Sequence, residues 1–471
     1  MKVSATWNGV TFSETDRCVI VGGVHYFPAE YVDSRYLEPN NHRTECPWKG
    51  TATYFDLIVS GTRLPHGAWQ YADPKDGYEH IRGAIAFSPA VRVERVDGEH
   101  DLESHVRSGA SAVQKAAATT AAKGPITDTN EEILSFLNQM PKCEVHLHLE
   151  AMIDAERLWR LVGRNPELLS RIAGREDLLR CFQVRSLDDF ITLFIGVIQP
   201  AIAQADDLTL FVEAARDYMQ RNRIEYAEMH LAPTKLLEKG LDFEEMVDVV
   251  DRSAAEVKRR DGLEMRFLID VSRGFGLENA QRNLDLTIAH RRDCIVGIGF
   301  GGAESAGPAS EFAIIFRQAR EAGLRTTAHA GEVVGPDSIR AAVDLCGAER
   351  IGHGVSAVED RSLIDELARR RIPVELCPSS NVFTGVYVES IGDHPMRTFF
   401  DAGIPVSLNT DDPVIFGVEL TDEFMSAHQY HHFTPAELVK LNDYAIDMSF
   451  MPESAKRAMK ARIQAVVGDT T

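Results

Sequence analysis

From about residue 142 onward, short apolar runs alternate with longer amphipathic segments. Two of these segments, DSIRAAVDLCGA and RSLIDELARRR, have the apolar spacing of a helix with one buried face. The apolar runs, in chain order, are CEVHLHL, EYAEMHL, EMRFLID, CIVGIGF, RTTAHA, RIGHG, PVELCP and PVSLNT. Regular alternation of strand and helix indicates a parallel sheet, and eight such units predict an α/β fold of the (β/α)8 barrel type. A doubly wound open sheet is the alternative, but no glycine-rich dinucleotide motif follows the first run.

The N-terminal part of the chain has a different pattern. Short apolar runs cut by turn residues, such as KVSATWNGVTF and CVIVGGVHYF, predict a small all-β domain over residues 1–100. The stretch SGASAVQKAAATTAAKG lacks large apolar side chains and indicates a linker, which we place at residues 101–128. Thr129 and Glu132 then form a capping-box pattern, so the second domain, residues 129–471, is expected to begin with a helix.

Composition and charge narrow the classes of partner. The chain has 471 residues, of which 44% are hydrophobic and 26% charged, as is ordinary for a globular protein of two or three domains. A formal charge of −21 argues against binding to nucleic acid or to an anionic membrane, since both require basic patches. The seven cysteines show no paired spacing, and the N-terminus lacks an apolar signal core. We therefore expect a cytoplasmic protein with a small-molecule partner, and an oligomer remains open.

Residues that can bind a metal ion stand at the ends of several predicted strands. His146 and His148 are two positions apart, so in a strand their side chains point to the same face. The ends of later runs carry, in chain order, His329, Glu332, His353, Asp411 and Asp412. Each feature alone also fits a solvated strand or a capped loop. In a barrel, however, the carboxyl ends of the strands meet at one mouth, and imidazole and carboxylate groups are ligands that zinc prefers. The sequence therefore predicts a metal centre.

The same residues lie in sequence blocks that resemble a known family. PKCEVHLHLE, TTAHAGE, RIGHG, ELCPSSN and SLNTDDP resemble the signature blocks of the adenosine deaminase family in order and spacing, over about residues 130–465. This resemblance implies a TIM barrel of the metal-dependent hydrolase type that removes an amino group from an adenine-type purine with water. It also implies one zinc ion with four protein ligands, which are His146, His148, His329 and Asp411. A common catalytic zinc centre has three protein ligands, so four of them imply five-coordination when water binds, and iron or cobalt also fits.

The resemblance implies roles for four further residues. Glu332 would protonate the purine ring nitrogen N1, which requires a carboxyl group with a raised pKa. His353 would orient the attacking water molecule and handle its proton. Asp412 would hydrogen-bond the purine nitrogen N7, and the backbone N–H of Gly302 would contact N3. These groups would satisfy the polar edges of a purine ring in a dry pocket.

Two stretches bear on the substrate. Glu150 and Ala151 stand where many family members have Asp-Gly, and in the family that acidic residue reaches the ribose 5′-hydroxyl. A glutamate there occurs in relatives that act on free adenine, whereas SSNVFTG and SLNTDDPVIFG are closer to the nucleoside branch. The expected substrate is adenosine or a related nucleoside, with adenine or a modified adenine nucleoside as alternatives. Leu187 and Phe190, in SLDDFITLF, resemble the helical flap over the purine, although their spacing also fits ordinary core packing.

Two other functions of the barrel fit the sequence less well. A non-catalytic purine sensor is disfavoured because every expected catalytic position is occupied. A binuclear hydrolase acting on a ring amide usually needs a bridging lysine on the fourth strand, and CIVGIGFGG has none. The N-terminal segments NHRTECPWKGTATYFDL and AWQYADP resemble a small bacterial domain family of unknown function, so the role of this domain stays open.

Overall fold

The computed structural model describes residues 3–15, 17–21, 24–46, 50–59, 61–75, 81–88, 91–95, 129–184 and 187–468. The chain divides into two compact units, residues 1–122 and 123–471. The predicted linker, residues 101–128, lies outside the described residues. None of the described helices is long and apolar enough to cross a membrane.

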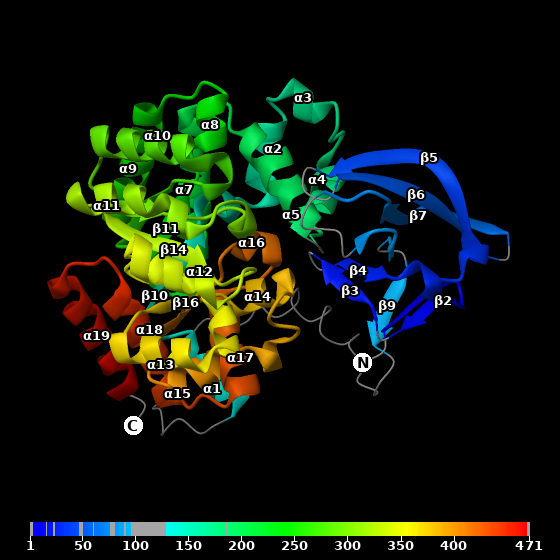
Figure 1. The fold of residues 1–471 in the computed structure, drawn as a ribbon. Helices are drawn as coiled ribbons and strands as arrows, with labels where there is room; N and C mark the ends of the chain where they lie inside the picture. Colours follow the sequence, from blue (N-terminus) through cyan, green and yellow to red (C-terminus); the bar gives the residue numbers. More distant parts are fainter. Residues whose placement is uncertain are drawn as a thin grey trace. The chain divides into compact units, whose positions relative to one another are not determined.

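The larger unit is a barrel of eight parallel strands, each paired with the next along the chain (Figure 1). The strands are β10 (Lys142–His148), β11 (Ile224–Leu231), β12 (Glu264–Asp270), β13 (Ile295–Gly299), β14 (Arg325–Ala330), β15 (Arg350–His353), β16 (Val374–Leu376) and β17 (Val406–Leu408). Backbone hydrogen bonds close the seam between the first strand and the last: the N–H of His148 donates to the carbonyl of Asp411 at 3.2 Å, and the N–H of Asp411 to that of His146 at 3.3 Å. The predicted (β/α)8 barrel is confirmed, and all eight predicted runs are strands.

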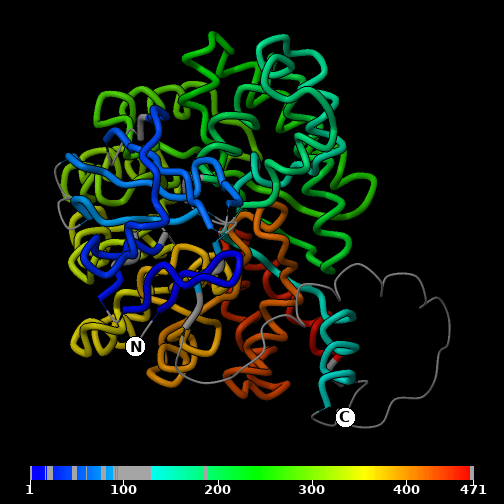
Figure 2. Tube along the Cα trace, turned by 90° about the vertical axis from the view of Figure 1, so that its right-hand side faces the viewer, coloured from blue at the N-terminus to red at the C-terminus, as the bar shows by residue number. Residues whose placement is uncertain are grey.

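Helices connect these strands and surround them, and in Figure 2 their colours advance round a ring from cyan through green and yellow to orange. They are α1 (Asn130–Leu137), α2 (Ala155–Val162), α3 (Pro166–Leu169), α4 (Arg175–Cys181), α5 (Leu187–Leu193), α6 (Gln199–Ala201), α7 (Leu208–Asn222), α8 (Thr234–Glu238), α9 (Phe243–Asp261), α10 (Gly276–Ala289), α11 (Ala313–Glu321), α12 (Pro336–Arg340), α13 (Arg361–Arg370), α14 (Pro378–Thr384), α15 (Met396–Asp401), α16 (Pro413–Phe416), α17 (Leu420–His431), α18 (Pro435–Met448) and α19 (Glu453–Gly468). The expected cap of the first helix is present, since Thr129 accepts a hydrogen bond from the N–H of Glu132.

The alternation of side chains along β10 explains how the barrel is built. Val145 and Leu147 are fully buried and belong to the apolar core, whereas His146 and His148 point to the other face of the strand. At the opposite end of the strand, the Lys142 ammonium group is buried and donates to backbone carbonyls, including that of Asn222 at 2.8 Å. The side chains of His146 and His148 therefore make the inside of the barrel polar at this end, whereas the face of β10 toward the helices is apolar.

The smaller unit is all-β, as predicted, with two antiparallel sheets in the orders β2-β1-β9 and β3-β4-β8-β7-β6-β5. Its strands are β1 (Val3–Trp7), β2 (Val10–Thr15), β3 (Val19–Val21), β4 (Val24–Phe27), β5 (Leu37–Cys46), β6 (Gly50–Val59), β7 (Thr62–Tyr71), β8 (Ile85–Phe87) and β9 (Arg92–Arg95). A core that includes Phe12, Phe27 and Phe87 packs between the sheets. The strand β5 has a turn-like sequence with Pro39, which is tolerated because β5 is an edge strand with a bulge after that proline.

Candidate metal centre and active site

Three histidines and one aspartate meet at the carboxyl ends of three barrel strands. His146 and His148 belong to β10, His329 to β14, and Asp411 follows β17. Each side chain offers one ligand atom, and these four atoms all lie within 4.8 Å of one another. Oδ1 of Asp411 lies 2.9 Å from Nδ1 of His148 and 3.4 Å from Nε2 of His146. The structure thus brings together the four residues predicted to bind metal.

The chemistry of these donor atoms fits a divalent metal ion. Within the described residues, Nε2 of His146, Nδ1 of His148, Nε2 of His329 and Oδ1 of Asp411 are buried without any hydrogen bond. Each buried polar atom without a partner costs about 1–3 kcal/mol. A cation bound by three imidazole nitrogens and one carboxylate oxygen removes these penalties together, and this is a ligand set that zinc accepts.

Two glycines make room for imidazole rings inside the barrel. A Cβ atom at Gly352, on β15, would lie 2.6 Å from Cε1 of His146. A Cβ atom at Gly299, on β13, would lie 2.1 Å from Nδ1 of His230. Any larger residue at either position would displace a ring. The glycines of RIGHG and GIGFGG are thus required for space at this end of the barrel.

A buried network of charges holds His146 from behind. Its Nδ1 lies 2.6 Å from Oε2 of Glu375, whose Oε1 accepts a hydrogen bond from Nε of Arg350 at 2.5 Å. Arg350 also pairs with Glu228 at 2.7 Å, and all three partners are at most 1% exposed. Burial alone lowers the pKa of His146, but the carboxylates of Asp411 and Glu375 raise it to about 9. The sequence analysis missed these partners, although each is a charged residue within an apolar strand run.

The two predicted catalytic residues, Glu332 and His353, lie beside the four metal-binding candidates. Nε2 of His353 is 3.7 Å from Oε2 of Glu332 and 4.0 Å from Oδ2 of Asp411. Burial, together with the negative charge of Asp411, raises the pKa of Glu332 to about 8, in the direction expected from the sequence. Burial lowers the pKa of His353 to about 3, so its imidazole is neutral near pH 7.

A chain of hydrogen bonds determines which ring nitrogen of His353 carries its proton. The N–H of Met396 donates to Nδ1 of His394, so the neutral ring of His394 carries its proton on Nε2. That Nε2–H faces Oδ1 of Asn381 at 3.2 Å, and the Asn381 amide therefore donates to Nδ1 of His353 at 3.1 Å. As a result, the neutral ring of His353 presents an Nε2–H to Glu332 and to the metal-binding cluster.

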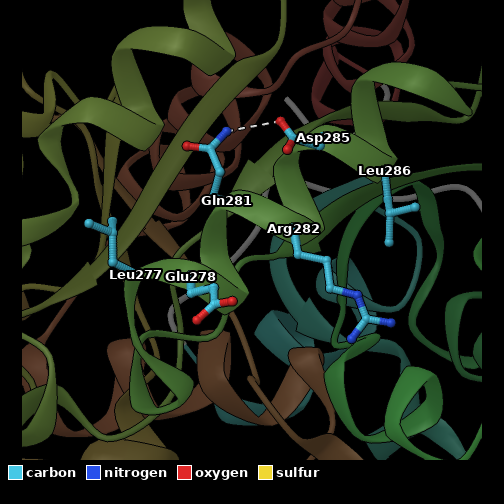
Figure 3. Close-up of a pocket in the computed structure, with 6 residues that line it drawn as sticks. All are labelled: Leu277, Glu278, Gln281, Arg282, Asp285 and Leu286. Carbon is cyan, nitrogen blue, oxygen red and sulfur yellow. Dashed lines mark hydrogen bonds between the residues drawn. The ribbon is translucent and has the colours of Figure 1, made fainter.

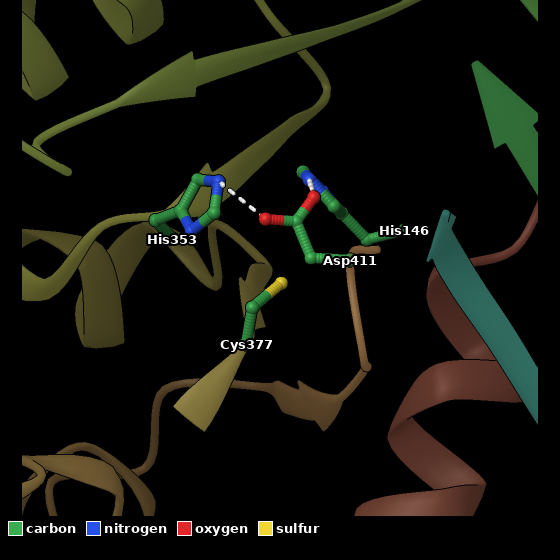
Figure 4. Close-up of side chains that lie close together, drawn as sticks. All are labelled: His146, His353, Cys377 and Asp411. Carbon is green, nitrogen blue, oxygen red and sulfur yellow. Dashed lines mark ion pairs between the residues drawn. The ribbon is translucent and has the colours of Figure 1, made fainter. Parts of the chain in front are cut away.

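Cys377, directly after β16, belongs to a second group of candidate metal ligands. Its thiol, His146, His353 and Asp411 offer ligand atoms within 4.8 Å of one another, and Figure 4 shows the sulfur directed toward Asp411. Burial raises the pKa of the Cys377 thiol well above its ordinary value, so the thiolate that a metal needs is disfavoured. The set of three histidines and Asp411 is therefore the better metal site. The sequence analysis gave Cys377 no role.

The acidic residues predicted to contact the substrate are both buried. Oδ1 of Asp412 lies 3.2 Å from Nδ1 of His148, and burial, reinforced by Asp411, raises the pKa of Asp412. Burial raises the pKa of Glu150 to about 7, and its Oε1 accepts the N–H of Ala232 at 2.9 Å. The other oxygen of Glu150 has no hydrogen-bond partner within the described residues. One carboxyl oxygen of Glu150 is thus available for a further contact.

Gly302 follows β13 and has a φ of 92°, a backbone conformation that favours glycine. Its neighbour Gly301 lies against the cluster, since a Cβ atom there would be 3.5 Å from Cε1 of His329. In the predicted flap, Leu187 is the first residue of α5, and its side chain is outside the described part of the structure. The Phe190 ring stacks on Phe416 with a centroid distance of 5.9 Å. Because Phe416 ends α16, the helix that follows Asp412, the flap packs on the segment next to the cluster.

Comparisons with known proteins agree with this geometry. The family model described as adenosine deaminase matches residues 141–466. This chain belongs to the adenosine deaminase family. It is a metal-dependent deaminase, and the family resemblance found in the sequence is confirmed. A second model, described as a domain of unknown function (DUF427), matches residues 1–101.

The relatives of this deaminase carry names with different substrates. An aminodeoxyfutalosine deaminase of Streptomyces avermitilis is 31% identical over 337 residues, which cover 71% of this chain and 93% of the relative. An adenosine deaminase of Salmonella typhi is 33% identical over 336 residues, covering 69% of this chain and 98% of the relative. The crystal structure of an adenine deaminase from Arthrobacter aurescens has a TM-score of 0.63 at 28% identity and covers 70% of this chain and 99% of that one. Relatives at these identities establish deamination but not which purine is used.

The deaminase has a further imidazole at the site that the sequence analysis did not single out. His230, on β11, pairs in register with His148, and its ring centroid lies 5.3 Å from that of His146, 5.2 Å from His148 and 5.1 Å from His329. It is 1% exposed, and neither ring nitrogen has a hydrogen bond within the described residues. Burial lowers the pKa of His230 well below its ordinary value, so the ring is neutral.

A pocket on the outer surface of the barrel is separate from this site. Its lining comes from α10 alone (Figure 3), and the residues are Leu277, Glu278, Gln281, Arg282, Asp285 and Leu286. None of the metal-binding or catalytic candidates is among them. The candidate active site is therefore the ligand cluster at the strand ends and not this pocket.

Proposed function

We propose that this deaminase hydrolyses the 6-amino group of an adenine-type purine to give the 6-oxo purine and ammonia, with adenosine or a related nucleoside as the first substrate. The observation that carries the proposal is the position of Glu332, a buried carboxyl group with a raised pKa, beside a cluster of three histidines and one aspartate. Such a pairing suits addition of water to a ring carbon while a neighbouring ring nitrogen is protonated.

We assign one zinc ion to His146, His148, His329 and Asp411. When bound, the metal ion supplies Lewis-acid chemistry, which lowers the pKa of a water molecule from about 15.7 toward about 7. The support for zinc is the donor set itself, three imidazole nitrogens and one carboxylate oxygen. Ser380 donates a hydrogen bond to Oδ2 of Asp411 at 2.7 Å, which leaves Oδ1 as the oxygen directed at the ligand cluster.

Glu332 and His353 divide the proton chemistry in this proposal. The carboxyl group of Glu332, whose pKa burial raises to about 8, holds a proton near neutral pH and donates it to N1 as water adds at C6. His353 presents Nε2–H, so it orients the attacking oxygen as a hydrogen-bond donor. Because Nε2 already carries a proton, His353 does not take the water proton as the family resemblance implied, and Glu332 has that role in this proposal. The ionised Glu332 that results then takes the proton of the attacking water and passes it to the leaving amino group. As the C6–N6 bond breaks, ammonia departs, the hydroxyl oxygen on C6 becomes the 6-oxo group, and its proton returns to Glu332.

The remaining predicted residues would bind the purine. Asp412, whose pKa is raised, shares a proton with N7, and the backbone N–H of Gly302 donates to N3. Phe190, on α5, closes the pocket above the ring and excludes water. The unpaired oxygen of Glu150 accepts a hydrogen bond from the ribose 5′-hydroxyl.

Free adenine is the second candidate substrate, and Glu150 is the observation that favours it. One of its oxygens is already bound to the N–H of Ala232, so the carboxyl group is held close to the barrel rather than extended toward a sugar. The relative of known structure named adenine deaminase covers 70% of this chain at 28% identity. A nucleoside would require the Glu150 carboxyl group to reach the ribose, whereas free adenine would require no such contact.

The test is ammonia release, followed together with absorbance near the purine maximum, for adenosine, deoxyadenosine, adenine, AMP and modified adenine nucleosides. Metal content is measured on the same sample. Turnover of adenosine with little turnover of adenine supports the nucleoside proposal. Turnover of adenine alone refutes it and supports the second candidate. Purine binding without ammonia release, in metal-loaded protein, refutes both and supports a sensor.

We also propose that the enzyme works in the cytoplasm. Cys143, Cys181, Cys294, Cys346 and Cys377 are free thiols. Unpaired thiols are usual in a reducing compartment.

A further inference from the structure

The carboxylate of Glu304 accepts four hydrogen bonds from one loop and a fifth from the helix that follows it. Glu304 begins a short helix, η8 (Glu304–Ala306), and is 5% exposed. The donors are the backbone N–H groups of Gly331 (2.5 Å), Glu332 (3.1 Å), Val333 (2.9 Å) and Val334 (3.0 Å) and the hydroxyl of Ser338 (2.5 Å). Four successive N–H groups aimed at one point form an anion-binding concavity of the backbone. In this protein a side chain from another strand end fills that concavity.

The loop has little freedom to adopt another shape. Gly331 has a φ of 72°, and a Cβ atom there would lie 2.5 Å from both Ile339 and Ser356, so the chain turns at the one position where glycine is needed. The loop then leads into α12, whose residue Ser338 supplies the fifth donor. Without Glu304, four buried or half-buried backbone N–H groups would lose their partner.

Glu304 also connects two segments that approach the substrate from different strands. It is two residues after Gly302, at the end of β13, and it binds the loop after β14 that carries Glu332. In the proposed reaction Gly302 contacts N3 and Glu332 contacts N1 of the same purine ring. The hydrogen bonds of the Glu304 carboxylate therefore set the distance between the backbone at Gly302 and the loop that carries Glu332.

We propose that Glu304 is a positioning residue, whose carboxylate holds the backbone of residues 331–334 so that Glu332 stays aligned with the purine ring bound at Gly302. This inference rests on the proposed function, because it uses the assigned roles of Glu332 and Gly302. Glu304 itself touches neither the ring nor the metal ligands. It acts through the loop, and its loss affects the proton donor rather than binding of the metal.

The test is Glu304→Gln, compared with Glu311→Gln, which removes the charge of an exposed glutamate in the same region. A glutamine has one acceptor oxygen, and its amide group would face N–H donors, so the loop loses part of its anchor. Misplacing a catalytic group by about 1 Å lowers rates by about 100-fold. We expect kcat to fall by about that factor, with KM within about threefold, zinc content unchanged and no effect of Glu311→Gln. We also expect faster amide hydrogen exchange at residues 331–334.

Rates are measured against pH, because a merely structural role would not alter the profile. Glu304 is one of the charges that raise the pKa of Glu332, so Glu304→Gln is expected to move the alkaline limb of the kcat/KM profile to lower pH. If Glu304→Gln does not fold, Ser338→Ala removes one donor and keeps the carboxylate, and kcat is expected to fall about three- to tenfold.

Three results would overturn the inference: an unchanged kcat in folded Glu304→Gln, unchanged exchange at residues 331–334, or an unchanged kcat in Ser338→Ala where only that variant folds. Absence of turnover by the wild-type protein on every purine of the panel would instead refute the proposed function. The two failures are distinguishable because the exchange measurement does not depend on activity.

Discussion

The 2.6 Å contact between Nδ1 of His146 and Oε2 of Glu375 leaves Nε2 as the free nitrogen of that histidine. A metal-binding imidazole is generally oriented by such a bond from its other nitrogen. Here the bond is supported in turn by Arg350 and Glu228, so a row of charged groups inside the barrel ends at the metal site.

Replacing Glu375 with glutamine is expected to weaken zinc binding. The neutral amide is a poorer acceptor for the Nδ1–H of His146, and the charge that balances Arg350 is lost, so we expect zinc affinity to fall about 10–100-fold. Competition with a chromophoric chelator measures this change. Glu278→Gln, on the exposed face of α10, is the control. Equal affinity in both variants would show that Glu375 does not orient the ligand.

Zinc affinity is expected to increase with pH up to about pH 9. The carboxylates of Asp411 and Glu375 outweigh burial and raise the pKa of His146 to about 9 in the metal-free protein. The ring is therefore protonated below that pH, and a metal ion must displace the proton. Asp412 and Asp411 outweigh burial and raise the pKa of His148 as well, so the apparent Kd should fall at least tenfold per pH unit between pH 7 and pH 8. A pH-independent Kd would contradict the assignment of His146 as a ligand.

Glu332→Gln is expected to lower kcat about 10²–10⁴-fold while zinc remains bound, because the amide cannot donate the proton that N1 requires. In the wild-type enzyme the active form is the protonated one. Since the pKa of Glu332 is raised to about 8, activity should decline as pH rises through that value, and the charge of a bound metal ion lowers this limit. Steady-state rates from pH 6 to pH 10 show the decline. Full activity in the glutamine variant would remove Glu332 from the mechanism.

The barrel and its ligand cluster could be predicted because each depends on local pattern. Eight apolar runs are strands, and polar residues at their ends meet because parallel strands share one mouth. The capping box at Thr129 was readable for the same reason, since all its atoms lie within four residues. These features need no knowledge of distant contacts.

What the sequence did not reveal depends on partners far along the chain. Glu304, Glu375 and His230 each have a residue type that is unusual inside an apolar segment. The partners of Glu304 and Glu375 are between 25 and 229 positions away in sequence, and His230 has no hydrogen bond within the described part of the chain. Strand β5 contains Pro39 and two asparagines, which are typical of turns, and its place at the sheet edge allows them.

Asn381→Asp is expected to change the tautomer of His353. The amide of Asn381 donates to Nδ1, whereas a carboxylate can only accept, so the ring proton should move from Nε2 to Nδ1. The orienting donor is then lost, and we expect kcat to fall about 10–100-fold. Nitrogen-15 shifts of labelled histidine report the tautomer, and Asn381→Ala, which leaves Nδ1 without a partner, is the comparison. Retention of the Nε2–H tautomer in the aspartate variant would contradict the hydrogen-bond polarity.

Glu150→Asp is expected to alter substrate choice more than rate. The shorter side chain withdraws its carboxylate by roughly 1.5 Å, so it cannot keep both the N–H of Ala232 and a substrate contact. If the nucleoside proposal holds, the ratio of kcat/KM for adenosine to that for adenine should change at least tenfold. Glu278→Asp serves as the matched control. An unaltered ratio would mean that Glu150 does not contact the part of the substrate that differs.

The seam between β10 and β17 joins the first and the last strand of the barrel to be synthesised, so it determines when the proposed metal site can be complete. Two of the four proposed ligands, His146 and His148, leave the ribosome more than 260 residues before Asp411, yet all three lie against the same seam. Domains generally fold as units, so the nascent barrel has an incomplete set of proposed ligands until its last strand is synthesised. In the proposed assignment, all four ligands come together only in the finished barrel.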